Sequence, residues 1–150
     1  MKTLSAVVIG AGDRGMRAYA PYALKFPHEL KIVGVAEINP KRREQFQKMY
    51  GLEDGACFSH WEDLLKQPRM ADIAIICTQD RMHYQPTVRA LERGYHVLLE
   101  KPMSPDPVEC IAMIRKAKEE GRLLTICHVL RYTPFWSAIK ENIEQGKIGS

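Results

Sequence analysis

The fold is decided by the stretch Ala6-Val7-Val8-Ile9-Gly10-Ala11-Gly12-Asp13-Arg14-Gly15, near the start of the chain. An apolar, β-branched run leads directly into the pattern G-x-G-x-x-G, and helix-forming residues follow it. A strand that ends in this pattern and leads into a helix is typical of the turn that binds the phosphates of a dinucleotide. The stretch therefore predicts a dinucleotide-binding fold, with Asp13 and Arg14 inside the turn.

Each glycine of the turn has its own physical role in this prediction. Gly10 allows a tight turn between strand and helix, and Gly12 lets a pyrophosphate approach the backbone because it has no side chain. Gly15 allows the helix to pack closely on the strand. The unpaired N–H groups and the positive dipole at the start of the helix then favour phosphate.

Strand-like and helix-like segments alternate along the whole chain of 150 residues, a length that fits one domain. This alternation predicts a parallel sheet with right-handed crossovers. We therefore expect one doubly wound α/β domain, a Rossmann fold, over residues 1–150. The predicted strands are 4–9, 30–36, 56–58, 73–77, 95–99 and 123–127, and the predicted helices are 13–26, 40–50, a short one after 59–62, 82–93, 104–120 and 134–145.

Four helix boundaries carry specific signals. Asn39-Pro40 predicts an N-cap followed by the first helical residue. Ser59 to Glu62 matches a capping box, and Ser104-Pro105 predicts the start of a further helix. Pro21 should kink or break the first helix, because proline has no backbone N–H.

Composition and charge exclude several classes of protein. The net charge of +4 is too small, and its Lys and Arg residues too dispersed, for a nucleic-acid interface. The sequence has no signal peptide and no apolar run long enough to cross a membrane. The four cysteines form no C-x-x-C pair or zinc-type spacing, and Cys77 and Cys127 lie in apolar runs that predict core positions. We therefore expect a cytoplasmic protein without a bound metal.

Glu37 ends the second predicted strand and is a candidate ligand for the adenine ribose. A carboxylate at this position accepts hydrogen bonds from both ribose hydroxyls and repels a 2′-phosphate, which favours NAD over NADP. Arg42 and Arg43 complicate this choice, because a nearby arginine can neutralise a 2′-phosphate. The alternative is that Glu37 is a solvated residue at a strand end.

Glu100-Lys101-Pro102 follows the fifth predicted strand. Ligands of open α/β sheets bind outside the carboxyl ends of the strands. A lysine there can donate a hydrogen bond to a substrate oxygen and pass a proton, so Lys101 is a candidate catalytic residue. The alternative is a surface salt bridge. The sequence leaves open whether the Lys101–Pro102 bond is cis or trans.

Taken in order, these motifs resemble the Gfo/Idh/MocA oxidoreductases, the family of glucose–fructose oxidoreductase and inositol dehydrogenase. The resemblance covers residues 3–150, and the E-K-P motif is its most specific element. It rests on Gly10–Gly15, Glu37, Thr78 to His83, Glu100-Lys101-Pro102 and His128 to Pro134. It implies a domain of an NAD-dependent oxidoreductase that transfers hydride between nicotinamide and a sugar, cyclitol or related polyol. A glycoside-cleaving NAD-dependent relative and a non-catalytic regulatory protein are the alternatives.

The resemblance also implies roles for individual residues. Lys101 would be catalytic, and Lys101 and His128 would contact the substrate. The implied cofactor-binding residues are Gly10, Gly12, Asp13, Arg14, Gly15, Glu37, Thr78, His83, Glu100, Lys101 and Arg131. Other roles remain open: His83 as a helix cap, His128 as a strand-end residue with a backbone partner, and Arg131 as the partner of a carboxylate such as Glu100. Trp61 and Trp136 are expected to be packing residues.

The chain departs from the family pattern in two ways. Thr78-Gln79-Asp80 stands where many members have Thr-Pro-Asn, which makes the contacts of this loop less certain. Members of the family continue into a C-terminal α/β domain that holds most substrate contacts and often mediates oligomerisation. We expect that domain to be absent from residues 1–150. A homo-oligomer of the full-length protein would form mainly through that domain.

Overall fold

The computed structural model describes residues 2–148, and its centre is a six-stranded sheet of order β3-β2-β1-β4-β5-β6. Every neighbouring pair of strands in this sheet is parallel. The chain first runs outward from β1 to β3 and then outward from β4 to β6, so the strand order reverses between β1 and β4. The doubly wound parallel sheet predicted from the sequence is confirmed. The strands are β1 (Leu4–Ile9), β2 (Leu30–Ala36), β3 (Cys57–Phe58), β4 (Ile73–Ile76), β5 (His96–Leu99) and β6 (Leu124–Ile126).

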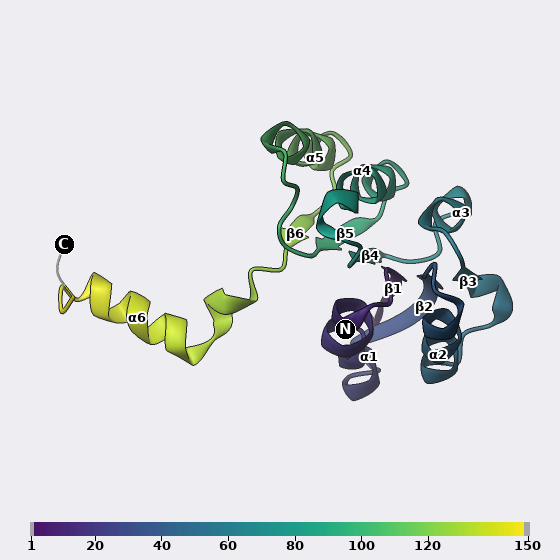
Figure 1. The fold of residues 1–150 in the computed structure, drawn as a ribbon, viewed down its shortest axis with the longest axis horizontal. Coiled ribbons are helices and arrows are strands. Elements are labelled where there is room, and N and C mark those ends of the chain that lie inside the picture. The colour runs from purple at the N-terminus through teal and green to yellow at the C-terminus, as the bar shows by residue number, and fades with distance from the viewer. Residues whose placement is uncertain (1, 149–150) are drawn as a thin grey trace.

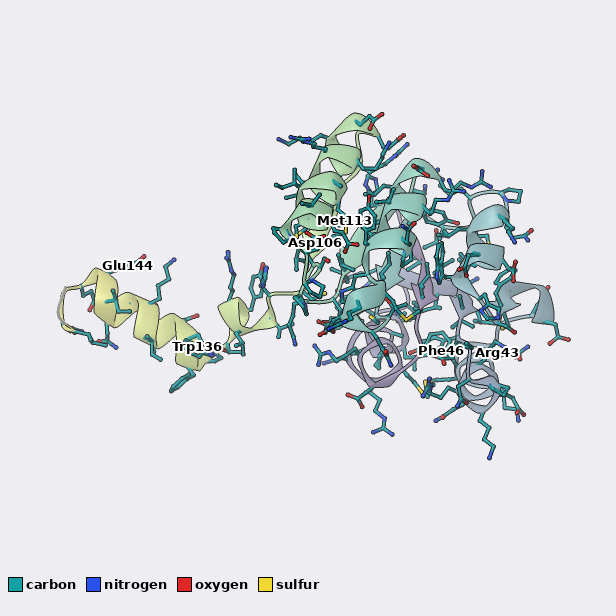
Figure 2. All side chains as sticks on the ribbon, turned by 45° about the horizontal axis from the view of Figure 1, so that its top comes forward. Arg43, Phe46, Asp106, Met113, Trp136 and Glu144 are labelled. Carbon is teal, nitrogen blue, oxygen red and sulfur yellow. The ribbon has the colours of Figure 1, made fainter. Side chains whose placement is uncertain are left out.

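Helices cover both faces of this sheet (Figure 1). One face packs against α1 (Pro21–Lys25) and α2 (Pro40–Tyr50), and the other against α3 (Trp61–Lys66), α4 (Tyr84–Glu92) and α5 (Pro107–Glu119). The core therefore has two apolar layers. Fully buried Phe46 of α2 lies in the first, and fully buried Met113 of α5 lies in the second (Figure 2). Because both faces are covered, β1 and β4 consist almost entirely of apolar residues.

The predicted break at Pro21 is confirmed. The chain after β1 forms a short π-helix, η1 (Arg14–Tyr19), and Pro21 then begins α1 in a position where no N–H is needed. The Asn39 cap is also confirmed, because its side-chain oxygen accepts hydrogen bonds from the N–H groups of Lys41 and Arg42 at 3.0 and 3.1 Å.

One predicted helix cap and one predicted helix start are wrong. No side chain caps α3, so the capping box predicted at Ser59 does not form. The helix predicted from Ser104-Pro105 begins at Pro107, and Asp106 is its cap, accepting a hydrogen bond from the N–H of Val108 at 2.8 Å. Ser104-Pro105 and Asp106-Pro107 have the same cap-and-proline pattern. Ser104 does not cap the helix. Its hydroxyl accepts a hydrogen bond from the N–H of Asp106 and donates one to the Glu109 carboxylate.

The C-terminal segment projects away from the sheet (Figure 1). It consists of η4 (Val129–Tyr132) and α6 (Pro134–Glu144), and no residue of α6 is buried. Trp136 and Glu144 mark how far α6 extends from the two packed layers (Figure 2). Trp136, expected to be a packing residue, is 46 % exposed and stacks edge-to-face on Phe135. The other short helices are η2 (Asp54–Ala56) and η3 (Asp80–Met82), and η3 makes α4 begin at Tyr84 rather than at Met82.

Candidate functional site

The glycines of the turn after β1 differ in the space around them. Gly10 has a φ of +92°, and a Cβ there would lie 2.6 Å from the carbonyl oxygen of Cys77. A Cβ on Gly15 would lie 2.1 Å from the carbonyl oxygen of Gly10. A Cβ on Gly12, in contrast, would meet nothing within 4 Å. Gly10 and Gly15 therefore shape the turn, and Gly12 leaves an open stretch of backbone that a ligand can approach.

A cavity of about 480 Å³ lies beside this turn, at the carboxyl ends of β1, β2 and β4. This position is next to the reversal of strand order, where open α/β sheets bind their ligands. Four of the predicted cofactor-binding residues line the cavity together: Gly10, Gly12, Glu37 and Thr78. Ile38, Trp61 and Met82 add apolar side chains to the wall, so the cavity combines polar groups with a surface suited to a flat ring.

Glu37 connects the glycine turn to the end of β2. Only 5 % of the residue is exposed, and one carboxylate oxygen accepts a hydrogen bond from the N–H of Ala11 at 2.8 Å. The other oxygen accepts from the N–H of Asn39 at 2.9 Å and from Nη2 of Arg42 at 2.7 Å. The alternative of a solvated strand-end residue is therefore wrong. Glu37 is a buried, hydrogen-bonded carboxylate in the wall of the cavity.

Glu100 occupies the corresponding position after β5 and is 4 % exposed. Its Oε1 accepts hydrogen bonds from Nε of Arg14 and from the hydroxyl of Tyr19, the latter at 2.7 Å, and its Oε2 accepts from the N–H of Lys101 at 2.6 Å. Burial acts to raise the pKa of Glu100, but the hydrogen bonds from Tyr19 and Arg14 outweigh burial, so the pKa lies below its usual value. Glu100 is therefore held ionised inside the protein.

The turn that carries Lys101 is held from a second direction by His83. Its ring is fully buried, with Nδ1 2.7 Å from the carbonyl oxygen of Pro102 and Nε2 3.1 Å from that of Thr78. The Lys101–Pro102 peptide bond is cis, and the Lys101 side chain is exposed. His83 thus connects the E-K-P turn to the loop after β4. It makes no side-chain cap on α4, and a cofactor contact by His83 stays a prediction.

Three predicted site residues lie neither in the wall of the first cavity nor in the contacts around Glu100 and Lys101. Asp13 is exposed, and its carboxylate lies 3.5 Å from Nη1 of Arg17. His128 is exposed and precedes η4, and Arg131 lines a second cavity of about 720 Å³ between η4 and α6. The arginine that pairs with Glu100 is Arg14 rather than Arg131. The contacts predicted for His128 and Arg131 at the nicotinamide or substrate end stay predictions.

Three residues that contribute to the site, Tyr19, Trp61 and Ile38, were missed or misread in the sequence. Tyr19 lies in the segment predicted as one long helix and belongs to no motif, so nothing in the sequence connects it to Glu100. Trp61 packs against the core, as expected, but it also lines the cavity. Ile38 could have been found from the sequence, because it directly follows the acidic residue at the end of β2. In the structure it is 68 % exposed.

The cysteines near the site are inert. Cys77 and Cys127 follow β4 and β6, on either side of Glu100, and Cys127 is buried as predicted. Burial raises the pKa of the Cys77 thiol to about 12 and also raises that of Cys127, so both thiols stay protonated near neutral pH. Among residues 2–148, no group of three or more His, Cys, Asp and Glu side chains is placed to hold a metal ion. None of the helices in this range has the length and apolar character to cross a membrane.

Comparisons with known proteins agree with this geometry. The chain is 27 % identical to D-glucoside 3-dehydrogenase of Escherichia coli, over 97 % of this chain and 40 % of the relative. It is 27 % identical to the NADP⁺-dependent scyllo-inositol 2-dehydrogenase of Bacillus subtilis, over 97 % of this chain and 39 % of the relative. The structure superposes on scyllo-inositol dehydrogenase of Lactobacillus casei, solved with NAD(H) and scyllo-inositol, with a TM-score of 0.86 and 25 % identity, over 99 % and 43 %.

The chain therefore spans about two fifths of the length of these relatives. The family model described as the oxidoreductase family with an NAD-binding Rossmann fold matches residues 4–128, which include β1 to β6 and both buried glutamates. The glycine turn, the buried acid after β2 and the E-K-P turn after β5 lie within this match. Together with the doubly wound sheet, they show that this chain belongs to the Gfo/Idh/MocA oxidoreductase family, as its NAD-binding domain.

Proposed function

We propose that this chain is the cofactor-binding part of an oxidoreductase that transfers hydride between a nicotinamide and a sugar, cyclitol or related polyol. The observation that carries the proposal is the cavity of about 480 Å³ at the reversal of strand order, with the open backbone of Gly12 on one side and buried Glu37 on the other. The named substrates of the relatives support the polyol class, and a further domain would present that substrate.

The residues present fit a dinucleotide. Gly12 offers open backbone to a pyrophosphate, and Glu37 lies in the same wall for ribose hydroxyls. The flat apolar wall formed by Ile38, Trp61 and Met82 suits an adenine ring. The bound nicotinamide would supply the hydride chemistry. The protein's own contribution is to bind, orient and move a proton.

We further propose that the cofactor is NAD rather than NADP. The Glu37 carboxylate repels a 2′-phosphate, and its buried position leaves it little freedom to turn away. Arg42 acts in the opposite direction, because its ion pair with Glu37 at 2.7 Å neutralises part of this charge. Glu37 also accepts hydrogen bonds from the N–H groups of Ala11 and Asn39. A 2′-phosphate that displaced the carboxylate would break both of these bonds, so the site favours NAD.

Lys101 is the proposed catalytic residue. Its side chain is exposed at the carboxyl edge of β5, while its backbone is fixed by Glu100 on one side. From this position its amine would bond a substrate hydroxyl and assist the loss of the proton as the hydride leaves the carbon. Glu100 is buried and paired, so it supports Lys101 and does not itself exchange a proton with substrate.

The test is a fluorescence titration of the Trp136→Phe variant. The chain has two tryptophans, so Trp61 alone then reports binding. NAD⁺ should quench Trp61 and bind at least about tenfold more tightly than NADP⁺, a difference of about 1.4 kcal/mol. Glu37→Ser should reverse this preference, because it frees Arg42 and two N–H groups to bind a phosphate. Glu29→Ser, which removes a partly exposed glutamate outside the cavity, is the control.

No binding of either cofactor to the folded chain at millimolar concentration would refute the cofactor site. A tenfold preference of the unaltered chain for NADP⁺ would refute the role of Glu37 while leaving the site itself intact.

A further inference from the structure

We propose that Tyr19 is a positioning residue that acts through Glu100 to fix the backbone of Lys101. The significance of this for catalysis rests on the proposed function, but the positioning itself is a property of the free chain. Three hydrogen bonds connect these residues: Tyr19 to Glu100, Arg14 to Tyr19, and the N–H of Lys101 to Glu100.

Within residues 2–148, only the Tyr19 side chain hydrogen-bonds both Arg14 and Glu100, the two members of this ion pair. Its hydroxyl donates to Oε1 of Glu100 at 2.7 Å and accepts from Nη2 of Arg14 at 3.0 Å. Its ring also lies under the Arg14 guanidinium, 5.2 Å from ring centroid to Cζ. Tyr19 therefore fixes the orientation of the guanidinium and of the carboxylate at the same time.

The other oxygen of Glu100 transmits this orientation to the catalytic turn. Oε2 accepts the N–H of Lys101 at 2.6 Å, so rotation of the carboxylate would break this bond. Arg14 alone is a weaker constraint, because its side chain is 45 % exposed and free to exchange Glu100 for water or for a phosphate. Tyr19 is half-buried and keeps Glu100 in place when Arg14 turns away.

The charged and titratable groups around Glu100 come from four elements. Arg14 and Tyr19 lie on η1, Cys77 and Cys127 follow the two flanking strands, and Lys101 is the next residue along the chain. The two thiols are protonated near neutral pH and carry no charge. The side chains of Tyr19 and Arg14 and the N–H of Lys101 therefore favour the ionised form of Glu100, and of the two side chains only Tyr19 can be changed without removing a charge.

The experiment compares Tyr19→Phe with Tyr22→Phe in the ¹⁵N-labelled 150-residue chain without cofactor. Tyr22 is a matched control, because its hydroxyl also donates to a glutamate, Glu29, but on the exposed surface. The first readout is hydrogen exchange of the Lys101 amide at neutral pH. Tyr19→Phe should accelerate this exchange by about tenfold, as expected for the loss of a hydrogen bond to a charged group, whereas Tyr22→Phe should leave it unchanged.

The second readout is the pH profile of the Lys101 amide proton shift, which reports the ionisation of Glu100 through Oε2. In the unaltered chain the midpoint should lie below the usual carboxyl range. Tyr19→Phe should move this midpoint to higher pH, because it removes one of the hydrogen bonds that stabilise the ionised carboxylate against the effect of burial. Unfolding curves of both variants verify that each is folded under the conditions used.

The proposal is overturned if Tyr19→Phe, while folded, leaves both the Lys101 exchange rate and the pH profile as they are in Tyr22→Phe. Failure of the unaltered chain to bind NAD⁺ would refute the proposed function instead. It would not change these two readouts, which are recorded without cofactor.

Discussion

Glu37 and Glu100 occupy corresponding places in the two halves of the sheet, at the carboxyl ends of β2 and β5. Both are almost fully buried, and each accepts a hydrogen bond from an arginine; Glu37 also accepts from two backbone N–H groups and Glu100 from one. Their surroundings differ. Glu37 lies in the wall of the main cavity next to Gly12, whereas Glu100 does not line it and supports the turn that carries Lys101.

This difference shows how one sheet edge provides two functions. The half around β1 and β2, which we call the cradle (Gly10, Gly12, Gly15 and Glu37), combines the open backbone of Gly12 with the carboxylate of Glu37 in the cavity wall. The half around β5, the clamp (Arg14, Tyr19, Glu100 and His83), satisfies its polar groups internally. Changes in the clamp should therefore lower stability first, and changes on the open side of the cradle should lower affinity first.

The largest effect is expected at Gly15, where the cradle turn packs on β1. In Gly15→Ala the new Cβ would lie 2.1 Å from the carbonyl oxygen of Gly10, which is backbone and has nowhere to move. We expect a loss of about 3 kcal/mol or more in the free energy of unfolding, as for other overpacked sites. Urea unfolding followed by circular dichroism measures it. A stability equal to that of the unaltered chain would mean that the turn is not built as described.

Glu100→Gln tests the clamp. The substitution removes the negative charge of the carboxylate that accepts hydrogen bonds from Arg14, Tyr19 and the N–H of Lys101. We expect a loss of about 2 kcal/mol in the free energy of unfolding. The loss is moderated because Arg14 is half-exposed and regains water. Glu29→Gln is the matched control, since Glu29 accepts Tyr22 at the surface. Equal stabilities of the two variants in urea would contradict the clamp.

Gly12→Ala separates the two halves most cleanly. Its Cβ meets nothing within 4 Å, and Gly12 is not among the glycines with positive φ. The free energy of unfolding should therefore stay the same or rise by about 0.5 kcal/mol, because alanine restricts the unfolded chain. Affinity for NAD⁺ should fall by about tenfold, because the methyl group occupies the approach to the pyrophosphate. Calorimetry and urea unfolding of the same sample measure both, and a parallel loss of stability would refute the distinction.

Acid should weaken the clamp. Hydrogen bonds lower the pKa of Glu100 in the folded protein, so its stabilising effect is complete above the ordinary carboxyl pKa of about 4.3. It is lost as the pH falls through the lower folded value. The unaltered chain loses unfolding free energy between neutral and acidic pH. We expect this loss to be about 1 kcal/mol smaller in Glu100→Gln. Urea unfolding across this pH range is the measurement, and identical pH slopes in the two proteins would contradict it.

The sequence predicted the cradle better than the clamp. Gly10, Gly12 and Gly15 follow one another on a single turn, and Glu37 ends the next strand, so local spacing is enough to connect them. The clamp joins Arg14 and Tyr19 to Glu100 across the sheet, and no spacing along the chain carries that information. The start of α5 was misplaced for a local reason, because Ser104-Pro105 and Asp106-Pro107 are equally good caps.

We propose that the cradle, and not another surface of the chain, binds NAD. The most direct test is an NMR titration of the ¹⁵N-labelled chain with NAD⁺. The amides of Ala11, Gly12, Ile38 and Thr78 should shift first and furthest, with smaller shifts along the clamp and none in α6. Shifts confined to α6 and η4, or no shifts at millimolar NAD⁺, would contradict it.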